Sequence, residues 1–297
     1  MAKEREKQIY IITVVGSIIN IFLVAIKFIA GFLGNSHAMV ADAVHSLSDL
    51  VTDVIVLAFV KLSSRPSDHD HAYGHGKFET LAASIVGFIL FLVGAVIFYD
   101  GARLVAAYLR GEILHEPKMV AFWVALISIA SKEALYQWTY IKGRAVKSSV
   151  VMANAWHHRS DAFSSIAAAI GIGGAIFLGE KWRVLDPIMA IAVSIFIIVI
   201  ALKFIKSSVD ELLEKSLPQE MQDEIMSTIN EVHGVNDPHA LKTRKIGSNI
   251  AIEMHLRFDP DTTVKAAHDI ATEVEDKLKT KYGPDTHVIT HIETFED

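Results

Sequence analysis

The sequence predicts a helical membrane protein with six transmembrane helices, followed by a small C-terminal α+β domain. Three observations lead to this expectation: the composition, the length of the apolar runs and the uneven distribution of charge. Of the 297 residues, 52% are hydrophobic and only 21% are charged. A soluble domain of this size needs far fewer apolar residues, so the chain belongs in a bilayer.

Six apolar runs are long enough to cross about 30 Å of hydrocarbon at about 1.5 Å per residue. They cover residues 9–33, 39–62, 81–109, 120–141, 149–178 and 184–205. The first run follows a short charged segment and is too long for a signal-peptide core, so it is interpreted as the first transmembrane helix. An even number of spans places both termini on one side of the membrane.

Basic residues in the short connections predict the orientation of the spans. Four of them lie on one side of the membrane: Arg110, Lys118, Lys181 and Arg183. Nine lie on the other side, with the N-terminus: Lys3, Arg5, Lys7, Lys61, Arg65, Lys77, Lys142, Arg144 and Lys147. The richer side is expected to face the cytoplasm, so the sequence predicts an integral plasma (inner) membrane protein with both termini in the cytoplasm.

The charge divides the chain into two parts. From Val209 onward, 9 basic and 19 acidic residues give a net charge of −10, and the remainder gives +4, which together make the −6 of the whole chain. The predicted domains are therefore a membrane domain over 1–208 and a soluble cytoplasmic domain over 209–297.

The C-terminal part has the periodicities of a mixed α+β fold. Apolar residues recur at helical spacing over 219–232 and 264–278, whereas apolar and polar residues alternate over 250–258. Segments 241–246 and 287–295 supply two further strands, and His255 falls on the polar face of the alternating strand. The expected order is helix, strand, strand, helix, strand.

Two His-xxx-Asp pairs carry the predicted chemistry. His45 and Asp49 lie in the second span and His157 and Asp161 in the fifth, and their i, i+4 spacing puts each pair on one helix face. Ionisable groups in hydrocarbon are costly and normally face a cavity, a partner or an ion. Two facing pairs offer two nitrogens and two oxygens, a tetrahedral set that suits Zn²⁺. The pattern indicates a transporter for divalent metal.

Other polar residues in the spans have simpler interpretations. Asp42 and Asp53 extend the polar stripe of the second span towards its ends, where hydrogen bonding to neighbouring helices explains them as well as metal binding does. Lys27, Lys132 and Glu133 are expected to reach the membrane surface or to pair structurally. The chain has no cysteine, so any metal must be held by His, Asp and Glu.

A histidine-rich loop follows the second span. Three His and two Asp lie between Asp68 and His75, and Gly74 and Gly76 let the backbone turn around an ion. The loop is either a chelating site or a loose metal-scavenging tract.

These motifs resemble the cation diffusion facilitator family of metal/proton antiporters, and the chain is similar to its bacterial ferrous-iron/zinc efflux branch. The resemblance covers nearly the whole chain and rests on both His-xxx-Asp pairs, the loop around His71, His75 and Lys77, and the C-terminal histidines. It implies an efflux transporter that forms a homodimer, with divalent ions, protons and the bilayer as its partners. It implies neither an enzyme nor a nucleic-acid binder.

The resemblance also implies three metal sites. The transport site would be His45, Asp49, His157 and Asp161, and the loop site would be Asp68, His71 and His75. The cytoplasmic site, with a structural or regulatory Zn²⁺, would be His239, His255, His268, His291 and Glu293. Lys77 would pair with Glu214 near the end of the sixth helix, while His37, His69, His115, His158, His233 and His287 match no family ligand.

Departures from the family pattern bear on the ion. His45 stands where the close bacterial relatives have Asp, and Glu293 and Glu214 likewise replace Asp. Carboxylate-rich sites are associated with iron or manganese, whereas two His and two Asp resemble zinc-selective members. The sequence therefore favours Zn²⁺/H⁺ antiport, with a broader Cd²⁺, Fe²⁺ or Co²⁺ exporter as the alternative. An intramembrane metal hydrolase lacks its His-Glu-xx-His motif here, and a non-transporting sensor would not need the intramembrane ligands.

Overall fold

The computed structural model describes residues 2–63, 65, 67–145, 149–247 and 249–295. Within these ranges, the side chains of residues 2–10, 13, 52–63, 149–150 and 153 lie outside the description. Asp53 and the basic side chains of Lys3, Arg5, Lys7, Lys61 and Lys147 are therefore outside the described residues.

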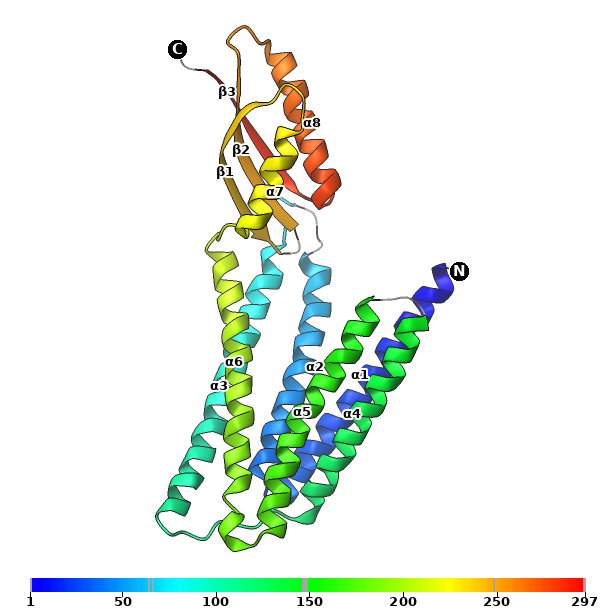
Figure 1. Ribbon diagram of the computed structural model, residues 1–297, viewed down its shortest axis with the longest axis vertical. Helices are drawn as coiled ribbons and strands as arrows, with labels where there is room; N and C mark the ends of the chain where they lie inside the picture. Colours follow the sequence, from blue (N-terminus) through cyan, green and yellow to red (C-terminus); the bar gives the residue numbers. More distant parts are fainter. Residues whose placement is uncertain (1, 64, 66, 146–148, 248, 296–297) are drawn as a thin grey trace. The chain divides into compact units, whose positions relative to one another are not determined.

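Long helices occupy all six predicted spans (Figure 1). They are α1 (Ala2–Leu33), α2 (His37–Ser63), α3 (Lys77–Leu109), α4 (Met119–Ala145), α5 (Ser149–Phe177) and α6 (Leu185–Leu212). Five of them are long and apolar enough to cross a membrane, counting only described residues. The second half of α2 lies outside that search. The helical architecture predicted from the apolar runs is confirmed.

The chain divides into two compact units, which are described separately. One comprises Met1–Val54 and Val86–Lys203, and the other comprises Ile55–Ile85 and Phe204–Asp297. Helix α6 continues past the boundary at residue 208 that the charge distribution indicates. The division into domains 1–208 and 209–297 stays a prediction.

Small residues let the helices of the first unit approach closely. Helix α4 packs against both α1 and α5, and the three run side by side (Figure 1). One buried cluster joins Ala30 of α1 and Met39 of α2 to Ala121 of α4 and Ala168 of α5. A second cluster packs α2 against α6 around Ala41 and Val193. This packing fixes how α2 and α5 present their polar residues.

The C-terminal part has the predicted order of elements. Helix α7 (Gln219–Asn230) is followed by β1 (Asn236–Ile246), β2 (Asn249–Phe258), α8 (Val264–Tyr282) and β3 (His287–Thr294). The three strands form one sheet in the order β1-β2-β3, with β1 antiparallel and β3 parallel to β2. The parallel pair follows from the crossover through α8, which returns the chain to the same end of the sheet.

One face of this sheet is apolar and covered by both helices (Figure 1). Alternate residues of β2, among them Ile252 and Leu256, are buried against Ile229 of α7 and Leu278 of α8. Because side chains alternate across a strand, the intervening residues of β2 point to the other face. His255 lies on that face and is only partly buried.

Candidate functional site

Helices α2 and α5 bring three of the four predicted transport ligands together. Ligand atoms of His45, Asp49 and Asp161 all lie within 4.8 Å of one another. His45 is 4% exposed and Asp161 is 3% exposed. The Nδ1 atom of His45 is buried without a hydrogen-bond partner among the described residues. A buried donor atom of this kind fits a metal ligand, because buried polar atoms are otherwise nearly always satisfied.

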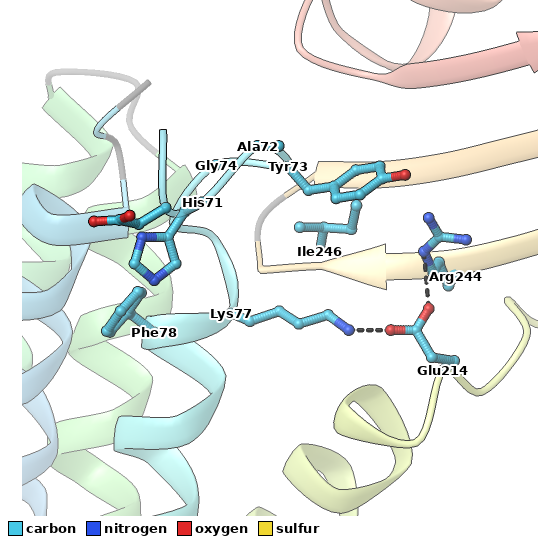
Figure 2. Close-up of a pocket in the computed structure, with 10 residues that line it drawn as sticks. His71, Ala72, Tyr73, Gly74, Lys77, Phe78, Glu214, Arg244 and Ile246 are labelled. Carbon is cyan, nitrogen blue, oxygen red and sulfur yellow. Dashed lines mark hydrogen bonds and ion pairs between the residues drawn. The ribbon is translucent and has the colours of Figure 1, made fainter. Parts of the chain in front are cut away.

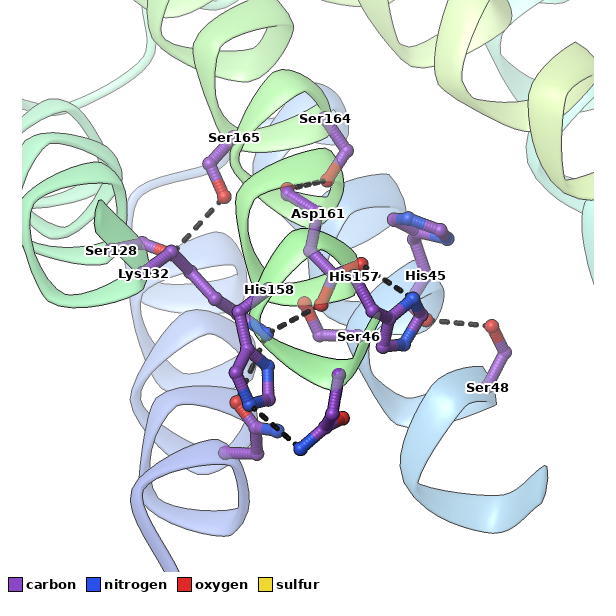
Figure 3. Close-up of polar contacts among 12 residues, drawn as sticks. His45, Ser46, Ser48, Ser128, Lys132, His157, His158, Asp161, Ser164 and Ser165 are labelled. Atoms are coloured by element: carbon purple, nitrogen blue, oxygen red, sulfur yellow. Dashed lines mark hydrogen bonds and ion pairs between the residues drawn. The ribbon is translucent and has the colours of Figure 1, made fainter. Parts of the chain in front are cut away.

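His157 lies beside this group without joining it. Its Nδ1 atom is 3.6 Å from Oδ1 of Asp161, one helical turn away, and its side chain is 49% exposed (Figure 3). The structure thus places His157 next to the site but does not bring it within the close cluster of the other three.

Lys132 of α4 reaches into the same site, and the sequence did not show its partner. Its Nζ atom lies 2.9 Å from Oδ2 of Asp161 and donates to Oδ1 of Asn20 at 2.9 Å. Both members of the ion pair are buried, with 2% and 3% of their side chains exposed. Lys132 therefore does not reach the membrane surface; it pairs structurally, and its partner is a predicted metal ligand.

Asp42 belongs to a second network, centred on Lys27. It forms an ion pair with Lys27 at 2.9 Å, and neither side chain has any exposed area. Ser164 and Ser165 of α5 donate to its two oxygens at 2.7 and 2.9 Å. These contacts satisfy Asp42, so the structure supports the hydrogen-bonding interpretation of this residue.

The loop between α2 and α3 gathers the three residues predicted there. Ligand atoms of Asp68, His71 and His75 lie within 4.8 Å of one another. The backbone N–H of His71 and of Asp70 donate to Oδ1 of Asp68, and the His71 bond above all holds the pKa of that carboxyl below its usual range. Nδ1 of His75 is buried and has no partner among the described residues. His69 is fully exposed and takes no part.

Beside the loop, the predicted pair between Lys77 and Glu214 is present. Figure 2 shows Lys77 and Arg244 approaching the same carboxylate. Arg244 lies 2.8 Å from Glu214 and 2.6 Å from Glu253, so it links the end of α6 to the sheet. Lys77, Glu214 and Arg244 line a cavity of about 570 Å³. The role of Arg244 was not visible in the sequence, because it depends on the pairing of β1 with β2.

The polar face of the sheet holds a third cluster. Strand register aligns His239 with His255 and His255 with His291. Glu293 lies 2.7 Å from Nδ1 of His255 and 3.1 Å from Nε2 of His239. Partial burial opposes ionisation of Glu293, but the hydrogen bond from His255 and the neighbouring imidazoles hold its pKa below the usual range. Two imidazole nitrogens and one carboxylate are a donor set that suits Zn²⁺.

Two further predicted ligands of this cluster are placed less closely. His291 is 63% exposed and lies 3.6 Å from Glu293. His268 is exposed on α8, whose buried face covers the opposite, apolar side of the sheet. The structure therefore does not bring His268 to His239 and His255.

We expect Glu293→Gln to weaken Zn²⁺ binding by the cluster of His239, His255 and Glu293 about tenfold or more. The substitution removes the only carboxylate that both histidines contact in the described structure. Equilibrium Zn²⁺ titration of the full chain measures the change. Glu275→Gln is the matched control, since Glu275 pairs with Lys279 on α8 and touches none of the cluster. Equal affinities in wild type and Glu293→Gln would contradict the prediction.

Apolar helices that bring His and Asp side chains together, followed by an α+β domain, are the arrangement expected of a membrane transporter for divalent cations. Comparison with known proteins agrees. Residues 13–213 match the family model described as "Cation efflux transmembrane domain", and residues 217–295 match "Cation efflux protein, cytoplasmic domain". The chain belongs to the cation efflux family, also called the cation diffusion facilitators, which are transporters rather than enzymes.

Similar proteins carry names for different ions. The manganese efflux system protein MneP of Bacillus subtilis is 33% identical over 299 residues, covering 99% of each chain. The magnetosome protein MamM of Paramagnetospirillum magneticum is 33% identical, covering 88% of this chain and 80% of MamM. A solved Zn form of the putative zinc transporter CzrB is 32% identical over 27% of this chain and 90% of the solved chain, with a TM-score of 0.25.

The protein is thus an integral membrane transporter that exports divalent metal cations and has a cytoplasmic C-terminal domain.

Proposed function

We propose that this chain exports Zn²⁺ from the cytoplasm in exchange for protons, with His45, Asp49, His157 and Asp161 as the transport site. The observation that supports this most strongly is the convergence of the His45, Asp49 and Asp161 ligand atoms within 4.8 Å, inside apolar helices. His157 completes the set by a change of rotamer, because its side chain is half-exposed and lies one turn from Asp161.

The donor chemistry accounts for coupling to protons. Zn²⁺ binds neutral imidazole and ionised carboxylate, so loading the site releases protons and proton binding releases the ion. The ligands lie on two helices, and rocking this pair against its neighbours would expose the site to each side in turn. Protons entering from outside then discharge Zn²⁺ outward.

The two other clusters are proposed as regulatory metal sites in a homodimer of the plasma (inner) membrane with both termini in the cytoplasm. Asp68, His71 and His75 form one of them, and the buried, unpartnered Nδ1 of His75 supports it. His239, His255 and Glu293 form the other, to which His268 and His291 would have to be recruited. Metal on these sites acts by binding one conformation more tightly than the other.

Manganese is the second candidate ion, because MneP carries manganese in its name and matches the chain over its full length. Carboxylate-rich sites suit Mn²⁺, whereas imidazole suits Zn²⁺. The buried imidazole of His45 among the converged ligands favours Zn²⁺.

Transport into inside-out proteoliposomes with an internal pH probe tests the proposal. We expect Zn²⁺ uptake accompanied by proton efflux from the vesicles, with Zn²⁺ taken up faster than Mn²⁺ at equal concentration. Uptake of Mn²⁺ alone would contradict the choice of ion but not the class of transporter. Failure to move either ion would contradict the transport function.

A further inference from the structure

Among the described side chains of the first unit, two lysines are buried, and each is paired with an aspartate on the α2/α5 helix pair. Lys27 of α1 pairs with Asp42, and Lys132 of α4 pairs with Asp161. Of these two aspartates, only Asp161 has a ligand atom within the close cluster of His45 and Asp49. Lys132 is therefore the lysine whose positive charge meets a candidate transport ligand directly.

A charged lysine buried among membrane helices is energetically costly unless its charge has a partner or a functional role. Its side chain is 2% exposed, and the described partners of its ammonium group are Asp161 and the amide oxygen of Asn20. The bond goes to Oδ2 of Asp161, while Oδ1 faces His157 (Figure 3). One oxygen of this carboxylate thus holds a fixed cation, and the other lies near His157, the fourth predicted ligand.

The balance of charge shows what this arrangement does to a bound ion. Two carboxylates and two neutral imidazoles just neutralise a divalent cation. Lys132 places a further positive charge beside the carboxylate of Asp161. This charge stabilises the metal-free site and repels a bound ion. Asn20 gives the ammonium group a second acceptor at 2.9 Å, so it has a nearby partner when the ion competes for Asp161.

We propose that Lys132 is a tethered counter-cation that competes with the transported metal for Asp161 and thereby sets its affinity and rate of release. The inference rests on the proposed transport site. Lys132 acts by shifting between Asp161 and Asn20. It is a positioning residue that keeps the site from holding the ion too tightly to discharge it.

Measurement of equilibrium Zn²⁺ binding tests the role of Lys132. The background chain carries Asp68→Ala, His255→Ala and Glu293→Gln, so that Zn²⁺ binding at the proposed transport site of α2 and α5 dominates. Lys132→Gln keeps a polar side chain without the charge. We expect its dissociation constant to fall about tenfold or more, and its maximal transport rate to fall because release becomes slower. Lys132→Arg keeps the charge and should bind within about threefold of the background chain.

Arg159→Gln is the matched control, since it removes one positive charge from α5 without contact to the ligands; Arg159 pairs with Glu133 and lies over the ring of Tyr136. It should change affinity by less than about threefold. Asn20→Leu removes the second acceptor without removing the lysine, so it should weaken Zn²⁺ binding and provides a test with the opposite sign.

The outcomes distinguish failure of the role inferred for Lys132 from failure of the proposed transport site. If the background chain binds Zn²⁺ and loses it with Asp161→Asn, but Lys132→Gln binds no more tightly than the background chain, the counter-cation role is wrong and the transport site stands. An equal gain in Lys132→Gln and Arg159→Gln would reduce the effect to net charge and also overturn the role. If Asp161→Asn does not affect Zn²⁺ binding, the transport site itself is wrong, and this inference with it.

Discussion

Asp49→Asn and Asp161→Asn should each reduce Zn²⁺ transport by about 100-fold or more. Each substitution replaces an ionised oxygen with a neutral amide in a cluster whose ligand atoms lie within 4.8 Å. Losses of 10–100-fold are typical even for outer-shell partners of a metal, so a direct ligand should cost at least as much. Initial rates of Zn²⁺ uptake into inside-out proteoliposomes measure the effect.

Asp100→Asn is the control for this experiment, because Asp100 lines a different cavity of the first unit together with His37 and Arg183. It should transport at close to the wild-type rate. Size-exclusion profiles and melting temperatures of all variants show whether they are folded. Transport by Asp161→Asn at half the wild-type rate or more would mean that the ion does not use this carboxylate.

Asp42→Leu should destabilise the protein by about 3–5 kcal/mol, because it leaves the ammonium group of Lys27 buried without a counter-charge. Neither side chain of this ion pair has any exposed area. The double variant Lys27→Met, Asp42→Leu should recover most of the loss, since replacing both partners with apolar residues leaves no buried charge. Ser165, which donates to Asp42, also lies 3.1 Å from the hydroxyl of Ser128 and therefore has another partner available when Asp42 is replaced.

Thermal unfolding of the purified protein measures this prediction. Glu112→Gln is the matched control: it breaks an ion pair with Arg110 in which both side chains are at least 60% exposed, and such a pair contributes about 0–1 kcal/mol. A double variant that is no more stable than Asp42→Leu would show that Asp42 and Lys27 have roles beyond neutralising each other. Equal effects of Asp42→Leu and Glu112→Gln would show that the buried pair is not a dominant contribution.

Much of the fold could be predicted from the sequence, because the signals for it are local. Apolar runs of sufficient length define the six helices, and the alternation of residues 250–258 gives β2 and its polar face. The pairing of His45 with Asp49 on one helix face, and of His157 with Asp161 on another, follows from 3.6 residues per turn alone.

The candidate site could be predicted only in part. Helical spacing shows which residues of one helix share a face, but it does not show what that face meets. The position of His157 outside the close cluster, and of His268 on the helix covering the opposite side of the sheet, depends on packing between distant segments.

By itself, the sequence determined the class of protein, the order of its elements and the residue types offered to a metal. The tertiary structure decided which ligands converge and which cations oppose them. His239, His255 and Glu293 meet because β1 and β3 align on either side of β2. Lys132 meets Asp161 because α4 packs closely against α5. Strand register and helix packing determine these contacts. They bring together residues that are far apart in the chain, and such contacts leave no periodic signal in the sequence.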